Sequence, residues 1–207
     1  MREDFLITAK DMAEGLTRLG QEDALSLDFL AERSRLELLD ASEGLTYRVA
    51  RPVIGEGLKC VAQDFELCMD IAANSPFHRL ADALGELTNE ALAMLRPSPL
   101  ATIDFNDLIV QRYTPGSRGI TPHRDHVRYQ GMVALVILVG EARFCITDDR
   151  AGTGAREISS PPGSLLLMRA PGYDGSKQRP FHTLRQIRTF RVSVGLRYDA
   201  RADQVAA

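Results

Sequence analysis

Two histidines and one aspartate are the side chains of this sequence best suited to hold a metal ion. His123 and Asp125 are separated by one residue, so on an extended chain they project from the same face. His182 follows Asp125 by 57 residues and precedes the last long apolar run. Two imidazoles and one carboxylate on one side of an ion leave its other side open for further ligands, and Fe(II) suits such a set. We predict that a rolled-up sheet brings His182 beside the first pair.

A third histidine, His126, lies close enough in sequence to compete as a ligand. On an extended strand, however, a side chain three residues after His123 points to the opposite face. We therefore predict that His126 lies at the rim of the site or in a turn and does not bind the metal.

The last apolar segment carries a second set of functional candidates. Between positions 191 and 197, Arg191, Ser193 and Arg197 occupy odd positions and apolar residues occupy even ones. One face of such a strand is polar and basic. Inside a packed barrel that face needs an anion, because an unpaired buried guanidinium is costly. A dicarboxylate would supply one, whereas on an exposed strand the arginines would lie in water.

The elements that must position these residues are short strands. From Ala101 onward, runs rich in Val, Ile, Leu and Phe are separated by Pro-Gly and Gly-rich turns. This pattern favours an all-β barrel or jelly roll. The predicted strands are Asp107–Tyr113, Met132–Val139, Ala142–Thr147, Ala155–Ile158, Ser164–Met168 and Arg188–Tyr198.

The first hundred residues have a helical pattern instead. Leucines among Glu and Arg predict a helix from Leu25 to Asp40, and a second helix begins at Ser75-Pro76 and ends before Pro97. Residues 45–53 look extended and suit a hairpin arm or a lid, and 56–73 fit either a helix or a loop.

One structural domain with three parts follows from these patterns. We predict a helical buttress over 1–100 with a possible lid near 45–55, a catalytic core over 101–200 and a tail over 201–207. The fold class is α+β, with a double-stranded β-helix (a cupin-like jelly roll) as its core and N-terminal flanking helices.

Composition limits the class of protein. With 44% hydrophobic and 26% charged residues, the chain is typical of a globular protein. The longest apolar run, Met132 to Val139, is far shorter than the roughly 20 residues of a membrane span. The polar N-terminus does not resemble a signal peptide, so we expect a cytoplasmic protein. Cys60, Cys68 and Cys145 lack metal-site spacing and are interpreted as structural thiols.

The order and spacing of five elements resemble the AlkB-like branch of the Fe(II)/2-oxoglutarate-dependent dioxygenases. That pattern is N-x-Y-x-x-G, then H-x-D, then a distal His, then R-x-[NS]-x-x-x-R. The resemblance covers about residues 105–200, roughly half of the chain. The matching residues are Gln111-x-Tyr113, Pro115-Gly116, His123-x-Asp125, His182 and Arg191-x-Ser193-x-x-x-Arg197.

The resemblance implies a role for each matching residue. His123, Asp125 and His182 would be the ligands of Fe(II), and the enzyme would use 2-oxoglutarate and O2 to oxidise a C–H bond. Hydroxylation, or demethylation where the oxidised carbon sits on nitrogen, would be the outcome.

The remaining matching residues would bind the cosubstrate. Arg191 would hold the distal carboxylate of 2-oxoglutarate, with Tyr113 and Ser193 as hydrogen-bonding neighbours, and Arg197 would lie near the end that chelates iron. Gln111 replaces the usual Asn, and its extra methylene alters its expected contact with the cosubstrate.

Charge favours a small-molecule substrate over nucleic acid. Residues 1–100 hold 10 Lys and Arg against 18 Asp and Glu, whereas 101–207 hold 15 against 10. An acidic first half is a poor platform for a polyanion, and the chain has no Trp for base stacking. Tyr47 is the candidate substrate contact, with Arg48 and Arg51 beside it if the substrate carries phosphate. AlkB-type demethylation of alkylated nucleic acid is the alternative.

Functions of a different class also fit the ligand set. A barrel that binds a metal or an anion without turnover is one, and a zinc hydrolase with the same three ligands is another. The basic face of the last strand argues against the hydrolase, because a hydrolytic zinc site needs no dicarboxylate pocket. The sequence does not specify an oligomeric state.

Overall fold

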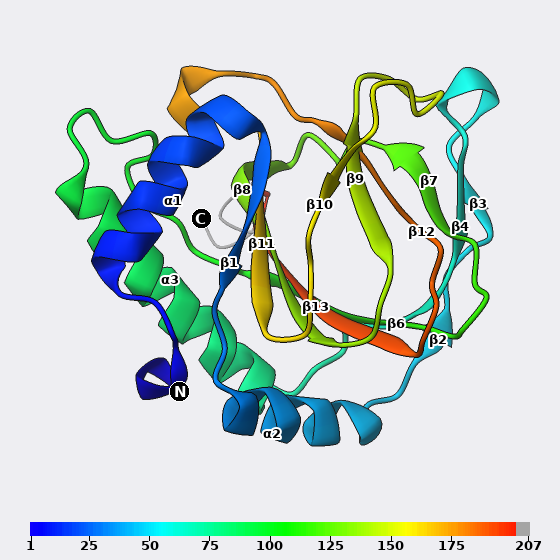
Figure 1. The fold of residues 1–207 in the computed structure, drawn as a ribbon, viewed down its shortest axis with the longest axis horizontal. Coiled ribbons are helices and arrows are strands. Elements are labelled where there is room, and N and C mark those ends of the chain that lie inside the picture. Colours follow the sequence, from blue (N-terminus) through cyan, green and yellow to red (C-terminus); the bar gives the residue numbers. More distant parts are fainter. Residues whose placement is uncertain (202–207) are drawn as a thin grey trace.

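Two antiparallel β-sheets face each other, and helices cover the outer face of the larger one (Figure 1). The computed structural model describes residues 1–201. The tail predicted for 201–207 therefore lies, apart from Arg201, outside the described residues. Because the two sheets enclose a core between them, the architecture is the predicted jelly roll, and the α+β class is confirmed.

The larger sheet has seven strands, and all of its neighbouring pairs are antiparallel. In spatial order they are β1 (Ala24–Asp28), β11 (Ser164–Arg169), β8 (Tyr129–Val139), β13 (Arg191–Asp199), β6 (Asp107–Tyr113), β5 (Glu66–Cys68) and β2 (Arg48–Val49).

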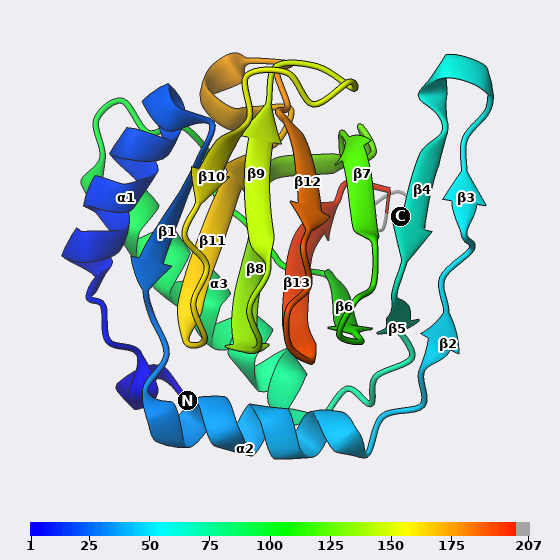
Figure 2. The ribbon, with the colours of Figure 1, turned by 45° about the vertical axis from the view of Figure 1, so that its right-hand side comes forward.

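The smaller sheet has six strands and carries both candidate histidine ligands. In spatial order they are β10 (Arg156–Ile158), β9 (Arg143–Thr147), β12 (Phe181–Arg185), β7 (Gly119–His123), β4 (Val61–Asp64) and β3 (Val53–Ile54). Strands β3 and β4 form a hairpin that stands beside β7 and extends past its end (Figure 2).

Three longer helices accompany the sheets: α1 (Ala9–Glu22), α2 (Glu32–Glu43) and α3 (Pro76–Met94). Helix α3 begins as the sequence predicts, with Ser75 as its N-cap and Pro76 in its first turn. The single-turn helices are η1 (Arg2–Asp4), η2 (Gly57–Lys59) and η3 (Tyr173–Gly175). Within residues 1–201, none of the helices combines the length and the apolar character needed to cross a membrane.

The two faces of the larger sheet bury different cores. Alternate residues of β8 and β13, such as Val136 and Val194, pack with the helices in one cluster. Residues on the inner face, such as Val133 and Leu166, pack toward the smaller sheet in a second cluster. This period-two division places side chains at odd positions of β13 in the space between the sheets.

The six strands predicted after residue 101 are present with ends shifted by up to three residues, as β6, β8, β9, β10, β11 and β13. The predicted helix from Leu25 to Asp40 is wrong at its start. Residues 24–28 form β1, which covers the edge of β11, with Leu25 opposite Leu167. Pairing at an exposed sheet edge overrides the local helical pattern there.

Residues 45–53 are extended, as expected, and contain β2. Residues 56–73, for which we expected a helix or a loop, contain η2 and the strands β4 and β5. Strands β2 and β5 extend the larger sheet, and β3 and β4 extend the smaller one. The first hundred residues therefore supply strands to both sheets as well as the longer helices.

Gly140, at the end of β8, allows the chain to pass close to the start of β13. Its φ of 97° is a backbone conformation that residues other than glycine rarely adopt. A Cβ added there would lie 2.5 Å from the Cα of Arg191. A larger residue would therefore displace the strand that carries the basic face.

We predict that Gly140→Ala lowers the free energy of unfolding by more than the strained backbone alone explains, which is about 1–3 kcal/mol. Gly116→Ala is the matched control, since Gly116 has a φ of 82° but no atom within 4 Å of the added Cβ. Urea unfolding measures both losses. Equal losses would contradict a steric role for Gly140.

Candidate metal and anion site

The predicted metal ligands meet at one end of the smaller sheet. Strands β7 and β12 are paired so that His123 lies directly opposite His182. Their ring centroids are 4.2 Å apart. Asp125 follows β7 in the next loop, and its Oδ2 lies 3.8 Å from His182 Nε2. One ligand atom from each residue lies within 4.8 Å of the others, so the three donors can share one ion.

Backbone carbonyls orient both imidazoles. His123 Nδ1 lies 2.9 Å from the carbonyl oxygen of Thr121, and His182 Nδ1 lies 3.4 Å from that of Pro180. A ring nitrogen that faces a carbonyl carries the proton, which leaves the other nitrogen free to bind a metal. Both Nε2 atoms are therefore available at the centre of the site.

The charge state at neutral pH suits a divalent cation. Burial, followed by the nearby His182, lowers the pKa of His123 to about 4, so this imidazole is neutral at pH 7. Burial acts to raise the pKa of Asp125, but the facing imidazoles of His182 and His123 hold it below its ordinary value. The site thus offers a neutral imidazole and an ionised carboxylate.

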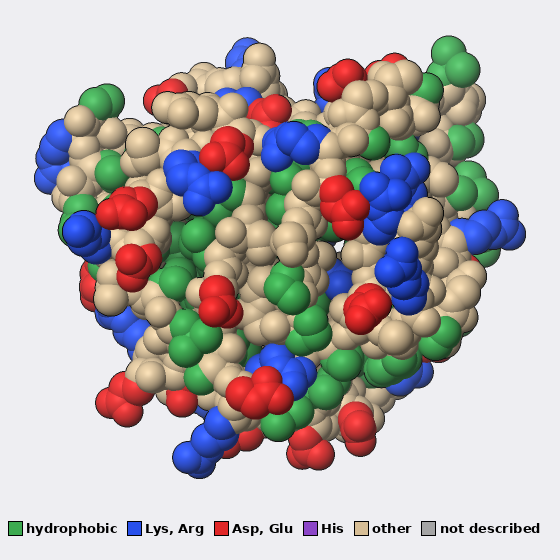
Figure 3. Space-filling model, viewed as in Figure 1, with side chains coloured by type: hydrophobic (Ala, Val, Ile, Leu, Met, Phe, Trp, Pro, Cys, Tyr) green, Lys and Arg blue, Asp and Glu red, His purple; other side chains and the backbone are tan. Residues whose placement is uncertain are grey.

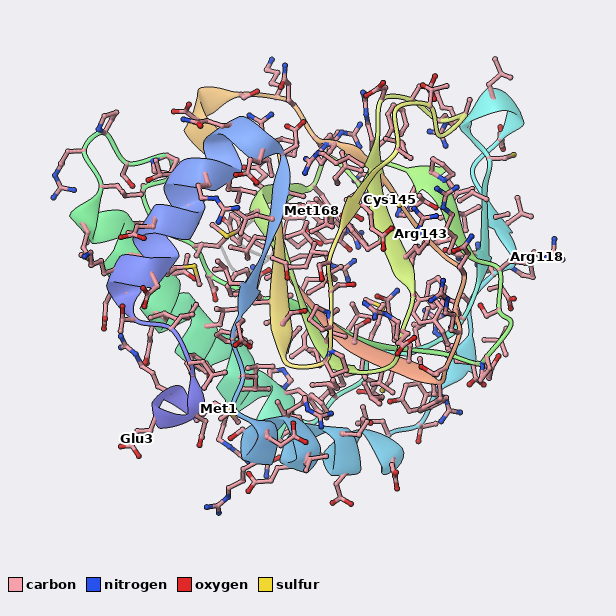
Figure 4. The ribbon with its side chains drawn as sticks, viewed as in Figure 1. Met1, Glu3, Arg118, Arg143, Cys145 and Met168 are labelled. Carbon is pink, nitrogen blue, oxygen red and sulfur yellow. The ribbon has the colours of Figure 1, made fainter. Side chains whose placement is uncertain are left out.

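The cosubstrate residues predicted from the sequence are brought together by the pairing of β6 with β13. Arg191 lies opposite Tyr113, and Ser193 lies opposite Gln111. All four side chains line one cavity between the two sheets. The metal ligands His123, Asp125 and His182 line the same cavity, and Met168, labelled in Figure 4, faces it from β11.

Arg191 lies deep in this cavity and lacks a counter-ion. Its side chain is 2% exposed, and no carboxylate of residues 1–201 forms an ion pair with it. Burial lowers the pKa of Arg191 to about 10, which still leaves it charged at pH 7. A buried charge of this kind requires an anionic partner.

The hydrogen bonds of Arg191 leave donors unused. Nη1 donates to the carbonyl oxygens of Gly140 (3.1 Å) and Ser160 (3.5 Å), and Nη2 donates to Ser160 Oγ (3.3 Å). Nε is buried and has no acceptor within the described part of the chain. A guanidinium has five N–H donors, so two of them are available to an incoming carboxylate.

Tyr113 and Ser193 flank this guanidinium and are themselves buried, with 3% and 4% of their surface exposed. Burial raises the pKa of Tyr113, although the Arg191 charge opposes the shift, so its hydroxyl keeps its proton. Gln111 is half-buried and lines both this cavity and the wider hollow into which the cavity opens. Tyr113, Ser193 and Gln111 thus line the same cavity as the predicted metal ligands.

Arg197 lines the cavity too, but its charge already has a partner. Its Nε donates to Asp107 Oδ1 at 2.8 Å, its Nη2 forms an ion pair with the same carboxylate, and its guanidinium lies 4.3 Å from the centre of the Tyr129 ring. Asp107 was not among the predicted site residues. It shares the odd positions of β6 with Gln111 and Tyr113, so strand alternation could have identified it.

The remaining sequence candidates lie outside the ligand set. His126 is exposed in the loop after Asp125, where its Nδ1 accepts a hydrogen bond from the backbone of Arg128. Tyr47 donates to the carbonyl oxygen of Ser42 and lies under the guanidinium of Arg112. Tyr47 lines neither the cavity nor the wider hollow outside it, and its contact with substrate stays a prediction.

Several solved structures are similar to this fold. A prolyl hydroxylase from Trichoplax adhaerens, in complex with a hypoxia inducible factor peptide fragment, aligns with a TM-score of 0.68 at 12% identity over 96% of this chain and 94% of its own. A 2OG-Fe(II) oxygenase family oxidoreductase from Burkholderia pseudomallei gives 0.65 at 12% identity, over 91% of each chain. A Pseudomonas putida prolyl-4-hydroxylase gives 0.64 at 14% identity, over 91% and 98%.

No protein-family model and no curated protein matches the sequence. At these identities the structural likeness establishes a shared jelly-roll fold. The AlkB-like branch suggested by the motifs is not among the similar structures described above.

We predict that Mn(II), a redox-stable probe, raises the melting temperature of the metal-free protein, because an ion that binds only the folded state stabilises it by about 2.7 kcal/mol at 100 times its Kd. His123→Ala, Asp125→Ala and His182→Ala should each abolish the shift. His126→Ala is the matched control and should retain it. Retention of the shift in any of the first three variants would refute the ligand assignment.

Proposed function

We propose that this protein is an Fe(II)/2-oxoglutarate-dependent dioxygenase that oxidises a C–H bond of a small molecule. The observation that carries the proposal is the buried, unpaired Arg191 in the same cavity as the His123, Asp125 and His182 cluster. A metal site needs no such cation, whereas a site for a metal and a dicarboxylate together does.

The donor set fits iron. Two imidazoles and one carboxylate from one side are the ligands that suit Fe(II) and leave positions for other molecules. His123, Asp125 and His182 would hold the ion, which when bound supplies the oxidative chemistry with O2. The same ligands in a zinc hydrolase would leave Arg191 without a function.

The buried arginine fits 2-oxoglutarate. Its two free N–H donors can grip a carboxylate, and a carboxylate would neutralise its charge. Tyr113 and Ser193 would hydrogen-bond the same group, and the distance from Arg191 to the ligand cluster is spanned by a single cavity. Arg197, paired with Asp107, would lie near the iron end without offering a free fork.

The reaction balances with these components. One O2 and one 2-oxoglutarate are consumed, one oxygen atom enters the C–H bond to give C–OH, and the other enters succinate as CO2 is released. The residues of this chain bind and orient the reactants, and the apolar walls formed by Val133, Leu135 and Phe144 exclude water from the cavity.

A small molecule is the favoured substrate. The similar solved structures include one in complex with a peptide fragment, so a peptide is a further substrate class of the fold. AlkB-type demethylation of nucleic acid is the alternative of the same chemistry. It is less favoured because the first half of the chain is acidic and because acidic and basic side chains are interspersed on the face shown in Figure 3. A cytoplasmic location stays a prediction.

The direct test is the formation of succinate from 2-oxoglutarate by the purified protein, with and without Fe(II) and O2. The proposal expects slow succinate release that requires both and that His182→Ala abolishes. A barrel that binds metal and anion without turnover would release none, and that result, obtained with iron and 2-oxoglutarate both bound, would overturn the proposal.

We predict that Arg191→Met weakens binding of 2-oxoglutarate strongly. Truncation of one partner of a buried charge pair costs about 2–5 kcal/mol, which is roughly a 30-fold loss of affinity or more. Arg197→Met should weaken 2-oxoglutarate binding less, because the Arg197 guanidinium already donates to Asp107. Calorimetric titration of the Mn(II)-loaded variants measures both, and equal affinity in wild type and Arg191→Met would place the cosubstrate elsewhere.

A further inference from the structure

The cavity opens into a wide hollow that the proposed iron and cosubstrate do not fill. This hollow has a volume of about 570 Å³, and His123 and Asp125 are among its lining residues. The β3–β4 hairpin, the loop between β9 and β10 and the residues before β12 contribute its walls. In Figures 1 and 2 the tip of the hairpin and the β9–β10 loop lie at the same end of the barrel. We call this hollow the mouth.

Basic side chains outnumber acidic ones among the lining residues of the mouth. Lys59, Arg124, Arg150 and Arg179 line it, and Asp125 is the carboxylate among its lining residues. None of these four cations forms an ion pair within 4.0 Å with a carboxylate of residues 1–201. Arg197 also reaches the mouth, but its charge is balanced by Asp107. The mouth is therefore a region of uncompensated positive charge.

The cations are held in place by contacts that leave their charges unneutralised. Arg124 and Arg150 both lie over the ring of Phe181, at 4.0 and 5.5 Å from its centre. Arg150 reaches the carbonyl oxygens of Lys59 and Cys60, at 3.4 and 3.5 Å, and so joins the β9–β10 loop to the hairpin.

Arg179 is held beside one of the proposed iron ligands. It donates to the backbone carbonyl of Asp125, so its guanidinium lies beside a metal ligand. Like charges at close range disfavour each other, and an anion placed among them would relieve that repulsion.

We propose that the mouth is an anion-binding subsite, formed by Lys59, Arg124, Arg150 and Arg179, that takes a carboxylate or phosphate group of a small substrate. The identification of the ligand as a substrate rests on the proposed function, whereas the anion site itself is inferred from its charges. Arginine suits both anions because its planar fork matches their oxygens. A substrate anchored there would place its remaining carbons over the His123 and Asp125 end of the cavity.

The position of the subsite distinguishes it from the Arg191 pocket. Arg191 lines the inner cavity but not the mouth, whereas Lys59, Arg124, Arg150 and Arg179 line the mouth but not the inner cavity. The chain therefore has two separate positive regions on the two sides of the metal ligands. One would hold the cosubstrate and the other the substrate to be oxidised.

The test is binding of inorganic pyrophosphate to the protein without iron or 2-oxoglutarate, measured by calorimetry at low ionic strength. We expect saturable binding whose Kd rises several-fold in Arg124→Gln or Lys59→Gln and about tenfold or more in the double variant, a loss of about 1.4 kcal/mol. Arg124 and Lys59 are exposed, so these changes should leave the fold intact. Circular dichroism checks this.

Two control variants make the result specific. Arg118→Gln removes an exposed arginine that lines neither cavity nor mouth and that points away from the molecule at the margin of Figure 4, so it should leave the Kd unchanged. Arg191→Met reports on the inner cavity, because pyrophosphate bound there in place of the mouth would lose its binding in this variant. Equal Kd values in wild type and the double variant, or a loss of binding in Arg191→Met alone, would overturn the subsite.

The size of the ligand is tested with the same variants. A short oligothymidylate or a glutamate-rich peptide that binds more tightly than pyrophosphate, and loses that binding in the double variant, would assign the cations to a polymer and overturn a small substrate. Because no iron or 2-oxoglutarate is present, failure of anion binding leaves the proposed oxygenase untouched. Absence of succinate formation, in turn, would not affect the binding result.

Discussion

A positive charge buried between two sheets is the constraint on which the rest of the site depends. Arg191 is almost fully removed from solvent, and no carboxylate of residues 1–201 compensates it. Gly140 and Ser160 occupy three of its donors through oxygen atoms that carry no full charge. The remaining stabilisation must come from an anion that enters the cavity, because a lone buried guanidinium is costly. The fold thus presents a buried guanidinium whose unused donors suit a carboxylate, and we infer that this carboxylate belongs to 2-oxoglutarate.

Strand register turns this constraint into a site. The pairing of β6 with β13 places Tyr113 and Gln111 opposite Arg191 and Ser193, and the pairing of β7 with β12 places the two ligand histidines opposite each other. A slip of one residue in either pair would turn these side chains to the other face. The large apolar cluster beneath the helices holds the register of β13, since its even-numbered residues are buried there.

Alternation made half of this site predictable from the sequence. The odd positions of 191–197 and the H-x-D spacing identify residues that the fold brings to one cavity. Strands β7 and β12 were not predicted. Pro122 lies inside β7, where proline usually argues against a strand, and β12 mixes polar and apolar residues directly after Pro180. Two features could not be predicted from local patterns: the ion pair of Arg197 with Asp107 and the basic mouth. Both depend on contacts between segments that are distant in sequence.

The central claim is that one cavity holds Fe(II) and 2-oxoglutarate in contact with each other. The most direct measurement is the visible absorption spectrum of the Fe(II)-loaded protein titrated with 2-oxoglutarate in the absence of oxygen. The account predicts a weak charge-transfer band that grows to saturation with 2-oxoglutarate, as expected when the cosubstrate chelates the iron. Binding of both components without such a band would contradict the account, because it would separate the anion held by Arg191 from the metal held by His123, Asp125 and His182.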